Sequence, residues 1–216
     1  MPDPIIVFDL DGTLVDSAPG ILASYHLTLD EWDRPADPRV LATLIGPPLH
    51  DSFARLGFVP EEIDAVVARY REHYAIVGPA GCTPYAGTRD LLERSHEVAT
   101  LAIATAKRED FARRILGEWG LEGYFHTIVG APVDGRRADK TSLVATVLGR
   151  EGGSPPEGWM VGDRRFDVEA GRAHGLRTLG VLWGYGSADE LTGAGVDALA
   201  RDAADAVARL TVSLAP

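Results

Sequence analysis

The chain has 216 residues, of which 45% are hydrophobic, so it is long enough to bury a sizeable core as one domain with an insertion. Its formal net charge of −11 argues against a surface for nucleic acid or for an anionic membrane, because both need basic patches. The single cysteine, Cys82, excludes internal disulfides and cysteine-based zinc sites. No apolar run approaches the roughly 18 residues of a membrane span, and no secretory signal is recognisable, so we expect a cytoplasmic protein.

The first predicted element is a buried strand, residues 5–10 (IIVFDL), which runs into two acids. Asp9 and Asp11 are two positions apart, and on extended backbone such residues share a face. Both carboxylates are therefore expected to point into one crevice. Paired acids at a buried edge are costly unless something cationic holds them, so this segment indicates a metal or a phosphate.

The next interval, residues 16–82, contains helical patterns and no convincing strand. The clearest patterns are residues 18–32 and 60–74, and the interval is far longer than a normal connection between a strand and a helix. We therefore predict a helical domain inserted directly after the first strand. Residues 1–15 and 83–216 are expected to form the core domain around it.

Four further apolar runs are predicted strands, each followed by a loop and a helical pattern: residues 99–105, 126–131, 158–163 and 178–184. They are apolar throughout rather than alternating, which is typical of a parallel sheet covered on both faces. Strands that alternate with helices predict right-handed crossovers and a doubly wound α/β fold. The tail, residues 197–210, is predicted to be a terminal amphipathic helix.

In an open α/β sheet, ligands bind at the carboxyl ends of the strands. The predicted strands end at Thr105 and at Asp163, and Asp167 follows four residues later, one turn away if a helix begins there. Together with Asp9 and Asp11, these acids form a hard oxygen-ligand set that suits Mg²⁺.

Only two of the 21 basic residues are lysines, and both lie in loops that face this predicted site. Lys140 opens the helix after the third strand, and its compact ammonium suits a phosphoryl oxygen. Lys107, just beyond Thr105, fits either a phosphate contact or an ordinary surface charge at a helix start. Asp167 similarly fits either a site residue or a helix cap.

Four segments resemble, in order and spacing, the motifs of the haloacid dehalogenase superfamily: DLDGT (residues 9–13), Thr105, Lys140 and GDRRFD (residues 162–167). The resemblance covers almost the whole chain. The insertion is similar to the helical C1 cap of the phosphoglycolate phosphatase and 5′-nucleotidase-like branch. This likeness implies a Rossmannoid core, Mg²⁺ as cofactor and a small phosphorylated metabolite as substrate. It implies no nucleic-acid partner and no membrane partner. It also implies that the protein is a monomer or a homodimer.

The resemblance also implies a role for each matching residue. Asp9 would attack phosphorus and form an aspartyl-phosphate, while Asp11 would protonate the leaving oxygen and then activate water. Mg²⁺ would be held by Asp9, the carbonyl of Asp11 and Asp163, with Asp167 in support. The phosphoryl oxygens would contact Gly12, Thr105, Ala106 and Lys140.

Two phosphatase classes remain open within the branch. Phosphoglycolate phosphatases usually carry Lys-Pro-x-Pro at the third motif, whereas this chain has ADKTSLV (residues 138–144). DGRRADK (residues 134–140) and GVLWGYG (residues 180–186) are likewise more similar to the 5′-nucleotidase-like branch. Substrate specificity is expected on the cap, where Gly46 and Pro47 begin a rigid turn.

Other activities of the superfamily fit less well. The insertion contains no lysine, which excludes the Schiff base of a phosphonatase, and Asp11 argues against a dehalogenase. Phosphoglucomutase-type phosphoryl transfer stays open, as does a non-catalytic module that binds a phosphorylated ligand. The four tryptophans are expected to pack rather than to take part in the site.

Overall fold

The computed structural model describes residues 4–132, 139–152 and 157–214. The chain forms two compact units, residues 1–15 with 84–216 and residues 16–83. It passes between them in two short strands that pair with each other, β2 (Val15–Asp16) and β3 (Thr83–Pro84). No helix in the described ranges is long and apolar enough to cross a membrane.

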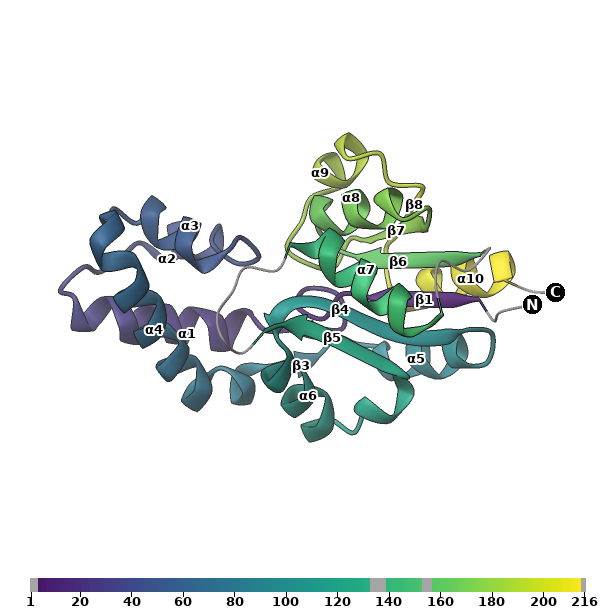
Figure 1. Ribbon diagram of the computed structural model, residues 1–216, viewed down its shortest axis with the longest axis horizontal. Helices are drawn as coiled ribbons and strands as arrows, with labels where there is room; N and C mark the ends of the chain where they lie inside the picture. The colour runs from purple at the N-terminus through teal and green to yellow at the C-terminus, as the bar shows by residue number, and fades with distance from the viewer. Residues whose placement is uncertain (1–3, 133–138, 153–156, 215–216) are drawn as a thin grey trace. The chain divides into compact units, whose positions relative to one another are not determined.

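The larger unit is built on a six-stranded sheet in which every pairing is parallel. Its strands, in spatial order, are β5 (Thr127–Ala131), β4 (Thr100–Arg108), β1 (Ile5–Phe8), β6 (Gly158–Gly162), β7 (Arg177–Val181) and β8 (Ala198–Ala200). The prediction of a parallel α/β sheet is confirmed. Because β1 lies between β4 and β6, the residues that follow these three strands emerge side by side at one edge (Figure 1).

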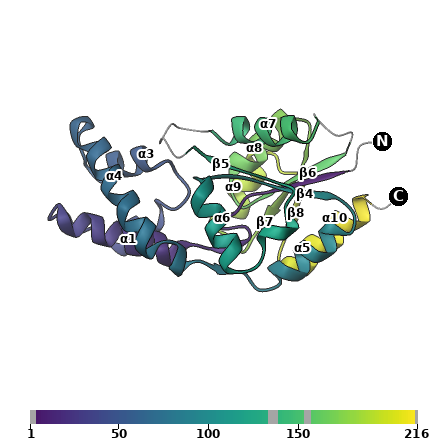
Figure 2. The same cartoon turned by 60° about the horizontal axis from the view of Figure 1, so that its bottom comes forward.

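Helices cover both faces of this sheet. Figure 2 shows α7 (Lys140–Arg150) and α8 (Arg165–Ala173) on one face and α5 (Thr88–His96) and α10 (Ala203–Leu214) on the other. The remaining helices of this unit are α6 (Glu109–Glu118), η2 (Glu122–Tyr124) and α9 (Ala188–Gly193). With both faces covered, the strands have no solvent side, which explains why they are apolar throughout rather than alternating.

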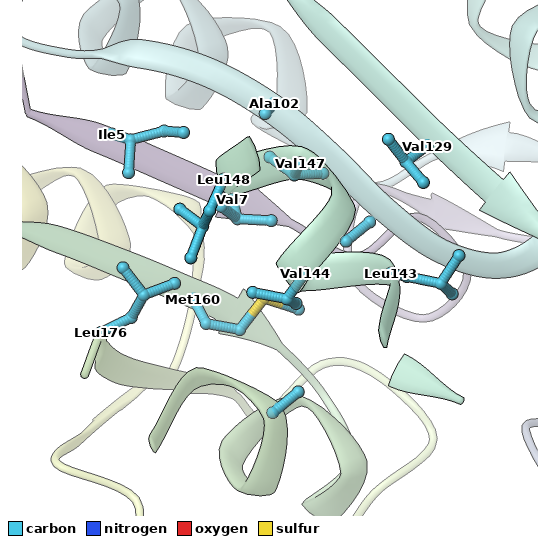
Figure 3. Close-up of a cluster of buried hydrophobic side chains, with 12 residues drawn as sticks. Ile5, Val7, Ala102, Val129, Leu143, Val144, Val147, Leu148, Met160 and Leu176 are labelled. Carbon is cyan, nitrogen blue, oxygen red and sulfur yellow. The ribbon is translucent and has the colours of Figure 1, made fainter. Parts of the chain in front are cut away.

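The core under α7 anchors the central strand. Figure 3 shows Val144, Val147 and Leu148 of α7 pointing toward Val7 of β1 and Met160 of β6, and all of these side chains are buried. Burial of one such side chain stabilises the fold by about 1.5–3 kcal/mol relative to exposure. The packing therefore fixes the end of β1, from which the first acidic residues emerge, and the start of α7.

The smaller unit is helical and has its own aromatic core, as predicted for an insertion after the first strand. Its helices are α1 (Ala18–Glu31), α2 (Pro38–Ala42), α3 (Leu49–Arg55), α4 (Pro60–Val77) and the short η1 (Pro79–Gly81). Tyr25, Phe53 and Tyr70 form a buried cluster with ring centroids 4.8–5.9 Å apart. Such contacts between large rings stabilise a small helical unit that could not bury a core by length alone.

Two elements differ from the sequence predictions. The tail predicted as one helix contains the edge strand β8 (Ala198–Ala200) before α10, because pairing with β7 outweighs the helix preference of its Ala-Leu-Ala sequence. β4 continues through Arg108, beyond the predicted end at Thr105, and α6 begins at Glu109. Residues 106–108 therefore belong to β4, and Lys107 is a strand residue rather than part of a helix start.

Two helical glycines of the larger unit make a matched pair for testing the packing. A β-carbon on Gly171 of α8 would lie 2.7 Å from Met160 Cβ and 2.8 Å from Thr178 Cγ2, whereas one on Gly149 of α7 would meet nothing within 4 Å. We expect Gly171→Ala to lower the free energy of unfolding by about 1–3 kcal/mol. Gly149→Ala should raise it by up to about 1 kcal/mol, because alanine is the better helix former. Urea denaturation measures both, and shifts of the same sign would contradict the close approach of α8 to the sheet.

Candidate active site

Three carboxylates meet at the carboxyl ends of β1 and β6. Asp9 follows β1 directly, Asp163 follows β6, and Asp167 lies in the first turn of α8. One oxygen from each lies within 4.8 Å of the others, and all three residues are buried. Three of the four acids that the sequence predicts at this sheet edge are thus brought together.

Lys140 is the cation inside this group. Its Nζ lies 2.7 Å from Asp9 Oδ1, 2.9 Å from Asp167 Oδ1 and 3.1 Å from the carbonyl oxygen of Ala104. The ammonium thus forms ion pairs with both carboxylates and donates a hydrogen bond to the carbonyl oxygen. The position of Lys140 is set by the preceding residue, Asp139, which caps α7 by accepting the backbone N–H of Ser142 at 2.9 Å.

Asp167 has two roles in the structure. Its Oδ2 accepts the backbone N–H of Arg164 at 3.0 Å, at the start of α8, while its Oδ1 pairs with Lys140. The sequence left the helix cap and the site residue as alternatives; the side chain caps α8 and also lies among the buried carboxylates, and its role in a reaction stays a prediction. A β-carbon at Gly162 would collide with this carboxylate, so the residue that ends β6 has to be glycine.

Asp163 is oriented by two hydrogen bonds from other loops. Thr13 Oγ1 donates to Oδ1 at 3.2 Å, and the backbone N–H of Tyr185 donates to Oδ2 at 2.8 Å. Gly12, with φ of +80°, allows the first loop to approach, since a β-carbon there would collide with the Asp163 carboxylate. The loops after β1 and β7 thus fix a carboxylate that follows β6.

Trp183 joins the same two loops, a role that the sequence did not predict. Its indole N–H donates to the carbonyl oxygen of Thr13 at 3.0 Å, so it is more than the packing residue expected. A β-carbon on Gly184 would collide with Asp163 Cβ and with the carbonyl of Gly12. Both residues belong to the GVLWGYG segment. From the sequence alone, this segment indicated only a branch of the family, and not that its residues position Asp163.

The electrostatics of the group fit a bound cation. Burial raises the pKa of Asp163 to about 7, and the nearby Asp167 and Asp9 carboxylates add to the effect. Burial likewise raises the pKa of Asp9 to about 6, although Lys140 opposes it. Burial alone would lower the pKa of Lys140, but Asp167 and Asp9 outweigh it and raise the pKa. Hard oxygen donors with uncompensated negative charge are a ligand set for a divalent cation such as Mg²⁺.

Asp11 lies outside this group of three carboxylates and has its own cation. Lys107 Nζ is 3.0 Å from Asp11 Oδ1, and the Lys107 side chain is only 5% exposed. Lys107 is therefore not the ordinary surface charge at a helix start that the sequence allowed. A metal contact through the Asp11 carbonyl stays a prediction.

The remaining predicted residues fall in two places. Thr105 is buried near the end of β4 and its hydroxyl accepts the backbone N–H of Lys107 at 3.2 Å, while Ala106 beside it is exposed. Gly46, with φ of +102°, and Pro47 belong to the smaller unit, between α2 and α3. Phosphate binding and substrate specificity at these residues stay predictions. The upstream third-motif residues 134–138 lie outside the described residues.

Substitution of Gly184 tests whether the loop after β7 positions Asp163. We expect Gly184→Ala to displace that carboxylate and to weaken divalent-cation binding about 10–100-fold, as loss of a supporting contact around metal ligands usually does. Calorimetric titration with Mg²⁺ measures the affinity. Gly193→Ala, at the end of α9 with open space around its β-carbon, is the matched control and should bind as the unchanged protein does. Equal affinities for all three proteins would refute the positioning role.

Comparison with known proteins gives the family of the chain. The chain matches the family described as haloacid dehalogenase-like hydrolase over residues 6–181. Tyrosine-protein kinase PtkA of Mycobacterium tuberculosis is 41% identical over 86% of this chain, but the match spans only 64% of that longer protein. The 5′-nucleotidase of Pseudomonas aeruginosa is 36% identical over 87% of this chain and 86% of that protein.

A solved structure supports the same assignment. The crystal structure of a predicted phosphatase from Clostridium acetobutylicum has a TM-score of 0.90 and 30% sequence identity, over 98% of this chain and 100% of that one. Its likeness extends through both compact units, because nearly every residue is covered. On the match of 6–181 together with these relatives, the chain belongs to the haloacid dehalogenase-like hydrolases.

Proposed function

We propose that this protein is a Mg²⁺-dependent phosphomonoesterase that acts on a small phosphorylated metabolite through an aspartyl-phosphate. The observation that carries the proposal is the buried Asp9 carboxylate, held by Lys140 at 2.7 Å beside Asp163 and Asp167. A carboxylate attacks an anionic phosphate readily only where positive charge reduces their repulsion. Lys140 supplies part of this charge, and a divalent cation bound by the same carboxylates would supply the rest.

The proposed reaction has two displacements. In the first, an oxygen of Asp9 bonds to phosphorus as the bond from phosphorus to the leaving oxygen breaks, and Asp11 gives its proton to that oxygen. In the second, water attacks phosphorus, Asp11 takes a proton from the water, and the bond from Asp9 to phosphorus breaks. Inorganic phosphate, the Asp9 carboxylate and the protonated Asp11 are the result, so atoms and protons balance.

The residues that would hold the charged partners follow from their positions. Mg²⁺ would be bound by Asp9 and Asp163, with Asp167 and the Asp11 carbonyl as further oxygens, and would supply charge neutralisation at the phosphoryl group. The side chains near this site are four carboxylates and two lysines: Asp9, Asp11, Asp163, Asp167, Lys107 and Lys140. When all are ionised, the net charge of these side chains is −2, which one divalent cation balances. The phosphoryl oxygens would contact Lys140, Thr105 and the backbone at Gly12 and Ala106.

A nucleoside 5′-monophosphate is the proposed substrate class ahead of phosphoglycolate. The third motif lacks the Lys-Pro-x-Pro of phosphoglycolate phosphatases, and the relative named 5′-nucleotidase is 36% identical over 86% of its length. We propose that the cap selects the leaving group, with the Gly46–Pro47 turn as a contact. A cap that covers the bound substrate would also exclude bulk water, which favours phosphoryl transfer to Asp9.

Phosphoryl transfer to another acceptor is the second candidate. The relative named tyrosine-protein kinase is 41% identical, which favours an acceptor hydroxyl in place of water. The attack by Asp9 would be the same in a kinase, a mutase and a phosphatase, and only the second acceptor would differ. The candidates therefore separate by product: inorganic phosphate from the phosphatase, and a new phosphate ester from the others.

A substrate panel with metal and with chelator tests the proposal. The panel contains adenosine 5′-monophosphate, 2-phosphoglycolate, glucose phosphates and p-nitrophenyl phosphate, and a parallel assay seeks phosphotyrosine formed from ATP. We expect Mg²⁺-dependent release of inorganic phosphate, fastest from the nucleotide. Asp9→Asn should reduce the release below detection while the melting temperature stays within a few degrees, because asparagine has the same shape as aspartate.

Asp189→Asn, on the exposed side of α9, is the control and should keep full activity. Substantial turnover by Asp9→Asn would rule out Asp9 as the nucleophile. Phosphotyrosine without free phosphate would overturn the phosphatase in favour of the kinase.

A further inference from the structure

Lys107 is a buried lysine that the proposed chemistry does not use. Its side chain is 5% exposed, and its Nζ lies 3.0 Å from Asp11 Oδ1. That oxygen is itself buried, so the 21% exposure of the Asp11 side chain comes from its other atoms. A buried ammonium is costly without a partner, so this pair is a specific arrangement and not a chance surface contact.

The backbone around Lys107 is shaped to bring it there. Thr105 of β4 is paired with Gly130 of β5, and the next pair is Arg108 with Ala131, so two residues of β4 bulge out against a single step on β5. Bulges next to active sites re-aim side chains. The Thr105 hydroxyl accepts the Lys107 N–H at 3.2 Å and closes the bulge.

Gly130 makes the bulge possible. A β-carbon there would lie 2.6 Å from the carbonyl oxygen of Lys107 and equally close to the backbone of Glu109. Only a residue without a side chain allows the two strands to approach so closely at this point. Since β4 lies beside β1 (Figure 1), the re-aimed side chain meets the loop that carries Asp11.

We propose that Lys107 is the positioning residue for Asp11. Its ammonium holds one carboxylate oxygen, and the exposed part of the carboxylate is thereby turned toward the leaving group. Each of the two lysines of the chain then has its own acidic partners. Lys140 forms ion pairs with Asp9 and Asp167, and Lys107 forms one with Asp11. The inference rests on the proposed function, in which Asp11 moves the proton.

The role of Lys107 has a consequence that depends on the substrate. An alkyl ester expels an alkoxide, which leaves only with a proton from Asp11, whereas p-nitrophenolate leaves without one. Loss of Lys107 should therefore slow the first displacement on alkyl phosphates and spare it on the aryl phosphate. A lysine that only bound the phosphoryl group, or only stabilised the fold, would affect both esters by the same factor.

The experiment compares Lys107→Met and Lys107→Arg with the unchanged protein in the presence of Mg²⁺. The substrates are p-nitrophenyl phosphate and whichever of adenosine 5′-monophosphate and 2-phosphoglycolate the unchanged protein hydrolyses faster. Lys107→Met should lower kcat/KM on the alkyl ester about 10–100-fold, part of what a general acid contributes, and on the aryl ester less than about threefold. Lys107→Arg keeps the charge and should recover part of the loss.

Two further variants sharpen the test. Asp11→Asn should show the same dependence on the ester, and adding Lys107→Met to it should cost little more on the alkyl ester, because two residues that act together are not additive. Arg113→Met, which removes an exposed cation from the following helix, should change neither ester. Thermal melting of every variant checks that it is folded.

Each outcome decides the inference. A larger loss on the alkyl ester, partial recovery with arginine and non-additivity with Asp11→Asn support it. Equal losses on both esters, or no loss, overturn it and leave the proposed phosphatase standing. If the unchanged protein releases phosphate from none of the esters, the proposed function fails, and the inference fails with it.

Discussion

The burial of like charges is the constraint on which the site depends. Asp9, Asp163 and Asp167 present oxygens within 4.8 Å of one another with almost no access to solvent. Removing a carboxylate from water costs several kcal/mol, and a neighbouring carboxylate adds to that cost. Lys140 offsets part of it by binding two of the three. The negative charge that remains makes the group a suitable ligand set for a cation, so the cost of burying these acids and their suitability for a metal have one cause.

The fold meets this constraint by fixing the backbone segments that carry the charged residues. Apolar side chains of α7 pack on β1 and β6, so the first turn of that helix, which carries Lys140, has little freedom to move. Gly12 and Gly184 in two loops, and Gly162 at the end of β6, allow the backbone to approach the carboxylates more closely than any side chain would. Rigid packing and missing β-carbons together hold the acids where repulsion would otherwise separate them.

The sequence predicts most of this arrangement, and the parts that it does not predict have identifiable physical reasons. Apolar runs that end in Asp9 and Asp163 are sufficient for the parallel sheet and for the edge at which its ligands bind. Lys107 was ambiguous because a bulge, which local sequence does not encode clearly, decides whether its side chain is buried. Trp183 was read as packing because its partner is the carbonyl oxygen of Thr13, 170 residues away. The edge strand β8 depends on pairing rather than on its own residues.

The central place of β1 affects the order in which a working protein is assembled. Its two neighbours in the sheet, β4 and β6, begin about 95 and 150 residues later, and Thr13 must reach Asp163 across 150 positions. A ribosome therefore has to release the chain through β6 before Asp9 and Asp163 come together. Contacts so distant in sequence also slow folding, because the entropy cost of closing a long loop precedes the gain from the contact. Growing chains thus keep Asp9 apart from Asp163 and Asp167 until the segment from β6 to α8 has been synthesised.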